Sequence, residues 1–182
     1  MFEPHELPSF EHAVLPHLDA AYNLARWLTR NEQDAQDVAQ EAYLRAFRFF
    51  PGFRGGDARA WLLQIVRNTC YTRFHTNRRL QDVAEFDESS FLLDSHAPNP
   101  EDIVLQKDNG NLVRKALEML TPNNREVLIL RELEGMSYRE IAQVTGMPMG
   151  SVMSSLSRAR DRLRQALAAV MREDLVPAHG ES

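Results

Sequence analysis

The sequence predicts an all-α protein with two small helical domains joined by an acidic flexible linker, the C-terminal domain being a helix-turn-helix. Apolar residues recur at steps of three and four in both halves of the chain, which is the period of an α-helix. Between Gln81 and Pro100 this period is lost, and the prolines and clustered Ser, Asp and Asn residues there are typical of a loop. Further on, a short capped helix is followed by a glycine-containing turn and a longer helix.

These observations place the two domains at residues 1–79 and 112–182, with the linker at 80–111. The alternative is a single domain carrying a long surface loop. Structureless loops of that length are uncommon inside compact domains unless they have a function, so we favour the linker.

The first predicted helix is marked by apolar residues at helical spacing, which are Val14, Leu18, Ala21, Tyr22, Ala25 and Leu28. Pro16 lies near its start. A proline at that point either opens a helix or kinks it, because the ring fixes φ and removes a backbone donor.

The second predicted helix runs from about Glu32 to Phe50 and ends at the breaker Pro51-Gly52. Val38, Ala42 and Phe49 form its apolar side, and Asp34, Asp37 and Glu41 lie together on another face. On spacing, this face is favoured as an ordinary solvated surface in which Glu41 pairs with Arg45. The alternative is a docking face for a basic partner.

A third helix is expected after Asp57, which has the side chain of an N-cap, and continues toward Thr76. In it, arginines alternate with aromatic residues, which are Arg59, Trp61, Arg67, Tyr71, Arg73 and Phe74. Rings can stack on unpaired bases while arginine neutralises their phosphates, so this pattern suits single-stranded nucleic acid. Equally, the rings can be core residues beneath a solvated arginine surface.

Three further helices are expected in the C-terminal half. The first starts at Thr121-Pro122 and ends before Gly135, where a left-handed cap is expected. The second is short, opens at Ser137 with a capping box and closes at Gly146. The third carries an apolar stripe made of Val152, Leu156, Ala159 and Leu163.

In a helix-turn-helix, the last of these helices enters the DNA major groove. Its side opposite the stripe carries Ser151, Ser154, Ser157 and Arg158, with Arg160, Arg162 and Arg164 on the flanks. Small hydroxyl side chains allow close approach to DNA, and arginine can pair bidentately with guanine. An ordinary helical hairpin with an arginine-rich surface is the weaker alternative.

Composition narrows the functional classes. The net charge of −5 and the pI near 5.7 by themselves disfavour nucleic-acid binding. By segment, however, the charge is −4 over residues 1–53, +5 over 54–79, −7 over 80–111 and +1 over 112–182. This alternation indicates a polyanionic partner or an acidic linker.

One cysteine, Cys70, excludes an internal disulfide, and together with the lack of a signal-peptide pattern or membrane-length apolar run it predicts a soluble cytoplasmic protein. The six histidines have no metal-ligand spacing, so neither a metal nor another cofactor is expected.

At the level of motifs, the chain resembles the extracytoplasmic-function (ECF) sigma factors, the small two-domain branch of the sigma-70 family. The resemblance covers about residues 10–168. Its marks are Asp34-Ala-Gln-Asp-Val-Ala-Gln-Glu-Ala-Tyr-Leu-Arg-Ala-Phe47, Phe53-Arg54-Gly55, Ala60-Trp61-Leu62, Arg67-Asn68-Thr69, Leu120-Thr-Pro, Arg125-Glu126-Val127, Gly135-Met-Ser-Tyr-Arg-Glu-Ile-Ala142 and Gly150-Ser-Val through Ser157-Arg-Ala-Arg160. All of them occur in the family's order and spacing.

This resemblance implies a function for each surface. The acidic helix then docks on core RNA polymerase, which reverses the preference for a solvated face; its contact residues are Asp34, Asp37, Val38, Gln40, Glu41 and Leu44. The third helix and the loop before it bind and open the −10 element through Arg54, Trp61, Arg67, Asn68, Tyr71 and Arg73, with Asn68 helping to hold a flipped-out base. The helix-turn-helix binds the −35 element through Ser151, Ser154, Ser155, Ser157, Arg158, Arg160 and Arg162.

The implied partners are core RNA polymerase, promoter DNA as duplex and melted strand, and an anti-sigma factor, with no membrane insertion and no chemistry of its own. One departure from the family stands out: Met153 and Ser155 occupy positions where Lys or Arg is common. Losing phosphate contacts there predicts weak DNA binding by residues 112–182 without polymerase.

The main rival is a free-standing helix-turn-helix regulator that binds duplex DNA without polymerase. A nuclease using Asp34, Asp37 and Glu41 with a divalent metal is a more remote alternative.

Overall fold

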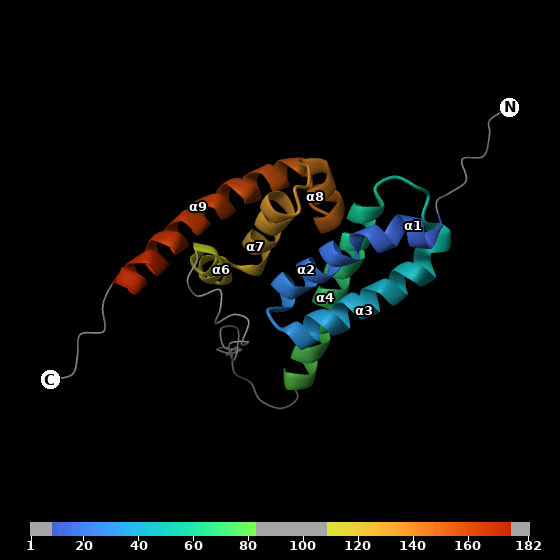
Figure 1. Cartoon of the computed structure of the whole chain (residues 1–182), viewed down its shortest axis with the longest axis horizontal. Coiled ribbons are helices and arrows are strands. Elements are labelled where there is room, and N and C mark those ends of the chain that lie inside the picture. Colours follow the sequence, from blue (N-terminus) through green and yellow to red (C-terminus); the bar gives the residue numbers. More distant parts are fainter. Residues whose placement is uncertain (1–8, 83–108, 176–182) are drawn as a thin grey trace. The chain divides into compact units, whose positions relative to one another are not determined.

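The computed structural model describes residues 9–82 and 109–175, and these ranges fold into helices joined by short connections (Figure 1). The described chain divides into two compact units. Among the described residues, the first unit comprises residues 9–82 together with Arg139–Met147. The second unit comprises residues 109–138 together with residues 148–175, which contain the long C-terminal helix. The all-α prediction is confirmed for the described residues.

The elements of the first unit are α1 (Phe10–Val14), a 3-10 turn (Leu15–His17), α2 (Leu18–Thr29), α3 (Glu32–Phe49), a 3-10 turn (Phe50–Gly52) and α4 (Ala58–Asp82). Pro16 lies in the first 3-10 turn, so of the two predicted effects the structure shows an interruption: one apolar stretch becomes α1 and α2. The second 3-10 turn contains Pro51-Gly52, as expected for the end of α3.

Side-chain caps mark the first residues of helices α3 and α4. The Oδ1 atom of Asp57 accepts a hydrogen bond of 2.9 Å from the Ala60 amide, which confirms the predicted cap of α4. Asn31 caps α3 in the same way, accepting 3.0 Å from the Asp34 amide. Between α2 and α3, Arg30 adopts a left-handed conformation with φ of 57°, which closes α2 and turns the chain.

The core of this unit lies where α2, α3 and α4 pack on one another, and fully buried side chains include Leu24, Val38, Leu62, Leu63 and Val66. An aromatic cluster closes one end of the bundle, in which Phe10 contacts Tyr43, Phe47 and Phe50, and Trp61 contacts Phe50 and Phe53. Such edge-to-face contacts add to the stabilisation from apolar burial.

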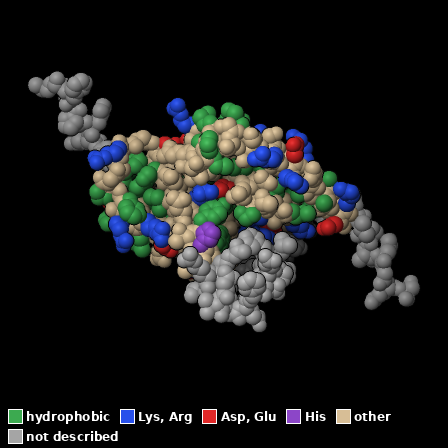
Figure 2. Space-filling view, turned by 180° about the vertical axis from the view of Figure 1, so that it is seen from behind, with side chains coloured by type: hydrophobic (Ala, Val, Ile, Leu, Met, Phe, Trp, Pro, Cys, Tyr) green, Lys and Arg blue, Asp and Glu red, His purple; other side chains and the backbone are tan. Residues whose placement is uncertain are grey.

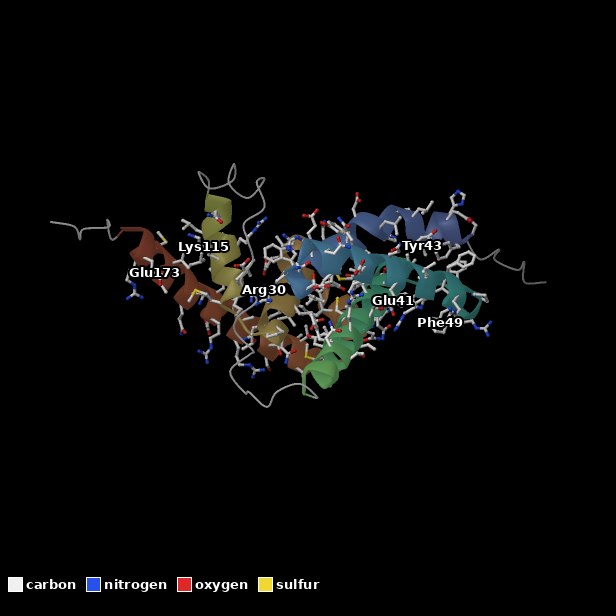
Figure 3. All side chains as sticks on the ribbon, turned by 90° about the horizontal axis from the view of Figure 1, so that it is seen from below. Arg30, Glu41, Tyr43, Phe49, Lys115 and Glu173 are labelled. Carbon is white, nitrogen blue, oxygen red and sulfur yellow. The ribbon has the colours of Figure 1, made fainter. Side chains whose placement is uncertain are left out.

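Two details of the predicted core are now settled. The prediction that Phe49 lies on the apolar side of its helix is wrong, because 57% of its surface is exposed. Phe49 is the last residue of α3 and is labelled in Figure 3. The aromatic cluster at this end is filled by Phe50, Phe53 and Trp61 instead. Cys70, the single cysteine of the chain, is buried within α4.

Only the margins of the predicted linker fall within the described residues. Helix α4 continues to Asp82 and α6 begins at Asn109, so both ends of the 80–111 range are helical. Residues 83–108, which include most of the predicted linker, lie outside the described residues.

The C-terminal half contains α6 (Asn109–Glu118), α7 (Pro122–Leu128), a π-helical segment (Ile129–Leu133), α8 (Tyr138–Thr145) and α9 (Met149–Leu175). Both α6 and α7 pack on α9, and the contact with α6 buries Ala116, Ala166 and Val170. The single helix predicted between Thr121 and Gly135 is instead an α-helical segment followed by a π-helical one, and the change occurs after Leu128. A π-helical turn adds about a residue per turn, and Leu133, the last residue of this segment, is 57% exposed.

The predicted ends of these helices are largely correct. Gly135 and Gly146 have φ of 64° and 73°, so both take the left-handed conformation that favours glycine after a helix. Thr121 precedes α7 as expected, but its hydroxyl makes no capping bond; its carbonyl oxygen instead accepts 2.9 Å from the Arg125 amide.

Candidate functional site

On α3, the residues expected to contact polymerase have very different exposures. Val38 is fully buried in the bundle core, so it can act only by supporting the helix. Asp34, Asp37 and Glu41 are partly exposed, and Gln40 and Leu44 are exposed. Glu41 pairs with Arg45 at 2.5 Å, as the i,i+4 spacing predicted.

An exposed apolar ridge runs beside these carboxylates. Gln40, Leu44 and Phe47 lie at i, i+4 and i+7 on α3, and Leu44 and Phe47 are both 60% exposed. We call these three residues the α3 ridge. Next to it, residues of α2 and α3 line an open groove of about 410 Å³, and Tyr22, Gln40 and Tyr43 are among them. Two large apolar side chains exposed along one helix suggest a surface that a partner covers.

Arg73 links the acidic face of α3 to α4. Its Nη2 atom donates a hydrogen bond of 2.9 Å to Oδ2 of Asp37, and it lies 3.6 Å from Oδ1 of Asp34. Gln33 donates to the other oxygen of Asp37 at 3.3 Å. The structure therefore brings together one residue expected at the −10 element and two expected at the polymerase surface, and Arg73 neutralises part of the charge on α3.

A double-mutant cycle tests this ion pair. For Arg73→Gln and Asp37→Asn, we expect a coupling energy of about 0.5–1 kcal/mol, the range for partly exposed pairs. Urea unfolding followed by tryptophan fluorescence measures it, because both tryptophans of the chain, Trp27 and Trp61, lie in the first unit. The same cycle with the exposed Asp19→Asn is the control; a coupling no larger than in that control contradicts the contact.

The expected −10 residues occupy α4 and the loop before it. Arg54 and Asn68 are exposed. The Arg67 guanidinium lies over the Tyr71 ring, 4.6 Å from its centroid, which is within the range of a cation–π contact. Trp61 is half-buried in the aromatic cluster, which agrees with a supporting role.

On α9, the predicted division into a buried stripe and a polar surface is confirmed. Val152, Leu156 and Ala159 are buried, and Leu163 is partly buried. Of the residues expected at the −35 element, Ser155 is partly exposed. The exposed ones are Ser151, Ser154, Ser157, Arg158 and Arg162. The space-filling view shows basic side chains dispersed among hydrophobic and polar ones (Figure 2).

Arg160 differs from the other expected −35 residues because it is held by another helix. Its Nε and Nη2 atoms donate to Oε1 of Glu132 at 3.2 and 2.8 Å, so α9 is tied to the π-helical segment. Hydrogen bonding to this carboxylate raises the pKa of Arg160, and the Tyr138 side chain adds to the effect. The Tyr138 ring is in turn covered by the Arg131 guanidinium, 5.1 Å from its centroid.

The described residues show no group of three His, Cys, Asp or Glu side chains placed to hold a metal ion. Within residues 9–82 and 109–175, none of the helices has the length and apolar character needed to cross a membrane.

Two models of sigma-70 regions match this chain, one in each half. The sigma-70 region 2 family matches residues 13–80, and the sigma-70 region 4 family matches residues 110–163. The sigma-H factor of RNA polymerase from Pseudomonas aeruginosa is 33% identical over 172 residues, which cover 91% of this chain and 89% of that protein. The chain belongs to the ECF sigma factors of the sigma-70 family.

Two further proteins place this sigma factor within the family. The ECF RNA polymerase sigma factor SigE of Mycolicibacterium smegmatis is 33% identical over 89% of this chain, but the match spans only 63% of the length of SigE. The solved structure of the sigma factor RpoE in complex with the anti-sigma factor NepR, from Bartonella quintana, has a TM-score of 0.68 and 29% identity, covering 89% of this chain and 98% of that one.

Sequence reasoning assigned no role to three residues, which are the exposed Phe47 and Glu132 and the buried Arg125. Phe47 was quoted only as the end of a motif, although its spacing from Gln40 and Leu44 already placed it on the α3 ridge. Glu132 and Arg125 were not assigned a role in this sigma factor. Glu132 accepts from Arg160, which lies 28 residues further along the chain. Arg125 donates to the carbonyls of Leu117 and Leu120, which lie 8 and 5 residues before it and outside its helix, so no helical period in the sequence connects these partners.

Proposed function

We propose that this sigma factor binds core RNA polymerase and directs promoter-specific transcription initiation, with residues 1–79 acting at the polymerase and the −10 element and residues 112–182 at the −35 element. The observation that carries the polymerase contact is the α3 ridge, where Leu44 and Phe47 are exposed beside Asp37 and Glu41. A partner surface with apolar side chains rimmed by basic ones fits this arrangement.

The DNA contacts are supported by the exposed residues of α4 and α9. On α4, the contact between Arg67 and Tyr71 offers a guanidinium and an aromatic ring to an unpaired base. The exposed amide of Asn68, the residue after Arg67, offers hydrogen bonds to the base edge. On α9, exposed serines and Arg158 face away from the buried stripe and are available to a duplex. Strand opening then follows from capture of unstacked bases, without a chemical step.

We further propose that the protein acts in the cytoplasm, where polymerase is, and that an anti-sigma factor controls it. RpoE, which shares its fold and 29% of its sequence, was solved bound to such a partner. No catalytic role is proposed, since sigma factors are initiation factors rather than enzymes.

Run-off transcription with core polymerase tests this function. Core enzyme with this sigma factor should produce a discrete transcript from a cognate promoter, and core enzyme without it should not. A free-standing regulator would instead bind the duplex by itself and leave the core enzyme inactive, which would refute the proposal. Cleavage of promoter DNA by the purified chain with Mg²⁺ would favour the nuclease alternative.

A further inference from the structure

The first turns of α9 expose two apolar side chains, Met149 and Met153, on the surface assigned to DNA. Met153 is 48% exposed, and its neighbours Ser154 and Ser157 are also exposed. Since successive helical residues are about 100° apart, Met153 lies between the buried stripe of Val152 and the outward face carrying Ser154 and Ser157. It is therefore on the rim of the polar face, within the part of the helix that base edges contact.

Two polar side chains on the same side of α9 as Met153 are engaged within the protein, those of Ser154 and Arg160. The hydroxyl of Ser154 donates to the Gly150 carbonyl at 3.0 Å, so its hydrogen is used within the helix and its oxygen is left as an acceptor. Farther along the same side of α9, Arg160 is held by Glu132. On this side of the first turns of α9, the long exposed side chains are those of Met149 and Met153. Met149 is the first residue of the helix, whereas Met153 lies a full turn inside it.

Met153 has no hydrogen-bond donor and only a weak sulfur acceptor, so it cannot recognise the polar pattern of a base edge. The apolar feature of the major groove is the C5 methyl group of thymine. Methionine is unbranched and flexible, which lets its terminal methyl follow the surface that it contacts.

We propose that Met153 determines specificity in the −35 element by packing on the C5 methyl group of one thymine. This inference rests on the proposed role of α9 in binding the −35 element. The small side chains of Ser154 and Ser157 beside it allow the helix backbone to approach the bases closely enough for this contact.

The test uses the holoenzyme and a promoter library with a randomised −35 element. The wild-type holoenzyme should enrich one −35 sequence that contains a thymine at a fixed position. That thymine is then replaced by deoxyuridine, which lacks the C5 methyl group and keeps the hydrogen-bonding edge. We expect this replacement to weaken wild-type binding about fourfold, the effect of one buried methyl-sized group.

The decisive comparison is the variant Met153→Ala, which should bind the thymine and deoxyuridine promoters equally. Met171→Ala is the matched control, because Met171 is 52% exposed on the same helix but outside the region 4 match, and it should keep the fourfold difference. Equal binding of both promoters by the wild type, or an undiminished difference in Met153→Ala, overturns the inference. Failure to enrich any −35 sequence overturns the proposed function itself.

Discussion

The variant Leu44→Arg is expected to bind core RNA polymerase about 100-fold more weakly than the wild type, a loss typical of a residue at the centre of an interface. Leu44 is 60% exposed in the free protein, so the substitution removes little from the core. In the complex it replaces an apolar contact with a charge. That charge also opposes the basic rim proposed for the partner surface.

Equilibrium titration of fluorescently labelled sigma factor with core polymerase measures this loss. The control is Met171→Arg, which places the same charge at a similarly exposed apolar position outside the proposed contact and should bind as the wild type does. The tryptophan-monitored unfolding midpoint should be unchanged in both variants. Wild-type affinity in Leu44→Arg would remove the α3 ridge from the polymerase interface.

The variant Arg125→Met is expected to lower the free energy of unfolding of the second unit by about 3 kcal/mol. Arg125 lies on α7 and is only 4% exposed. Its guanidinium donates to the carbonyl oxygens of Leu117, Glu118 and Leu120 at 2.9, 3.1 and 2.8 Å, which completes the C-terminal end of α6. Methionine keeps the length of the side chain but provides no donor to these carbonyls. The Leu117 carbonyl keeps only the bond of 3.2 Å from the Leu120 amide, and the buried Leu120 loses the bond from Arg125.

The distribution of tryptophan allows the two units to be followed separately. Both tryptophans, Trp27 and Trp61, lie in the first unit, so their fluorescence reports unfolding there. Amide hydrogen exchange in α6 and α9 reports on the second unit. Arg125→Met should accelerate exchange in α6 and α9 while leaving the fluorescence midpoint in place.

The control for this experiment is Arg162→Met, an exposed arginine replaced in the same way, for which we expect a change below about 0.5 kcal/mol. Unchanged exchange in Arg125→Met would mean that the three carbonyls do not depend on this side chain.

Features set by neighbouring residues in the chain were predictable from the sequence. The cap at Asp57, the stop at Pro51, the left-handed Gly135 and Gly146, and the buried stripe of α9 all depend on one helical segment and its ends. Local sterics and the helical period determine them, so they are visible in a short stretch of sequence.

Features that depend on which helices meet were not predictable in this way. Phe49 has the spacing of a core residue but is exposed, because Phe50, Phe53 and Trp61 occupy that end of the bundle. Likewise, the π-helical segment that displaces Leu133 to the surface has no signature in the helical period.

By itself, the sequence determined the helical architecture and, through its ordered motifs, the surfaces expected to contact polymerase and promoter DNA. Only the tertiary structure decided which charged side chains are engaged within the protein. Arg73 and Arg160 look alike in the sequence as basic residues on DNA-facing helices, yet each is held by a carboxylate on another element. The physical reason is that an ion pair forms where two side chains meet in space, and the distance between them along the chain does not reveal that meeting.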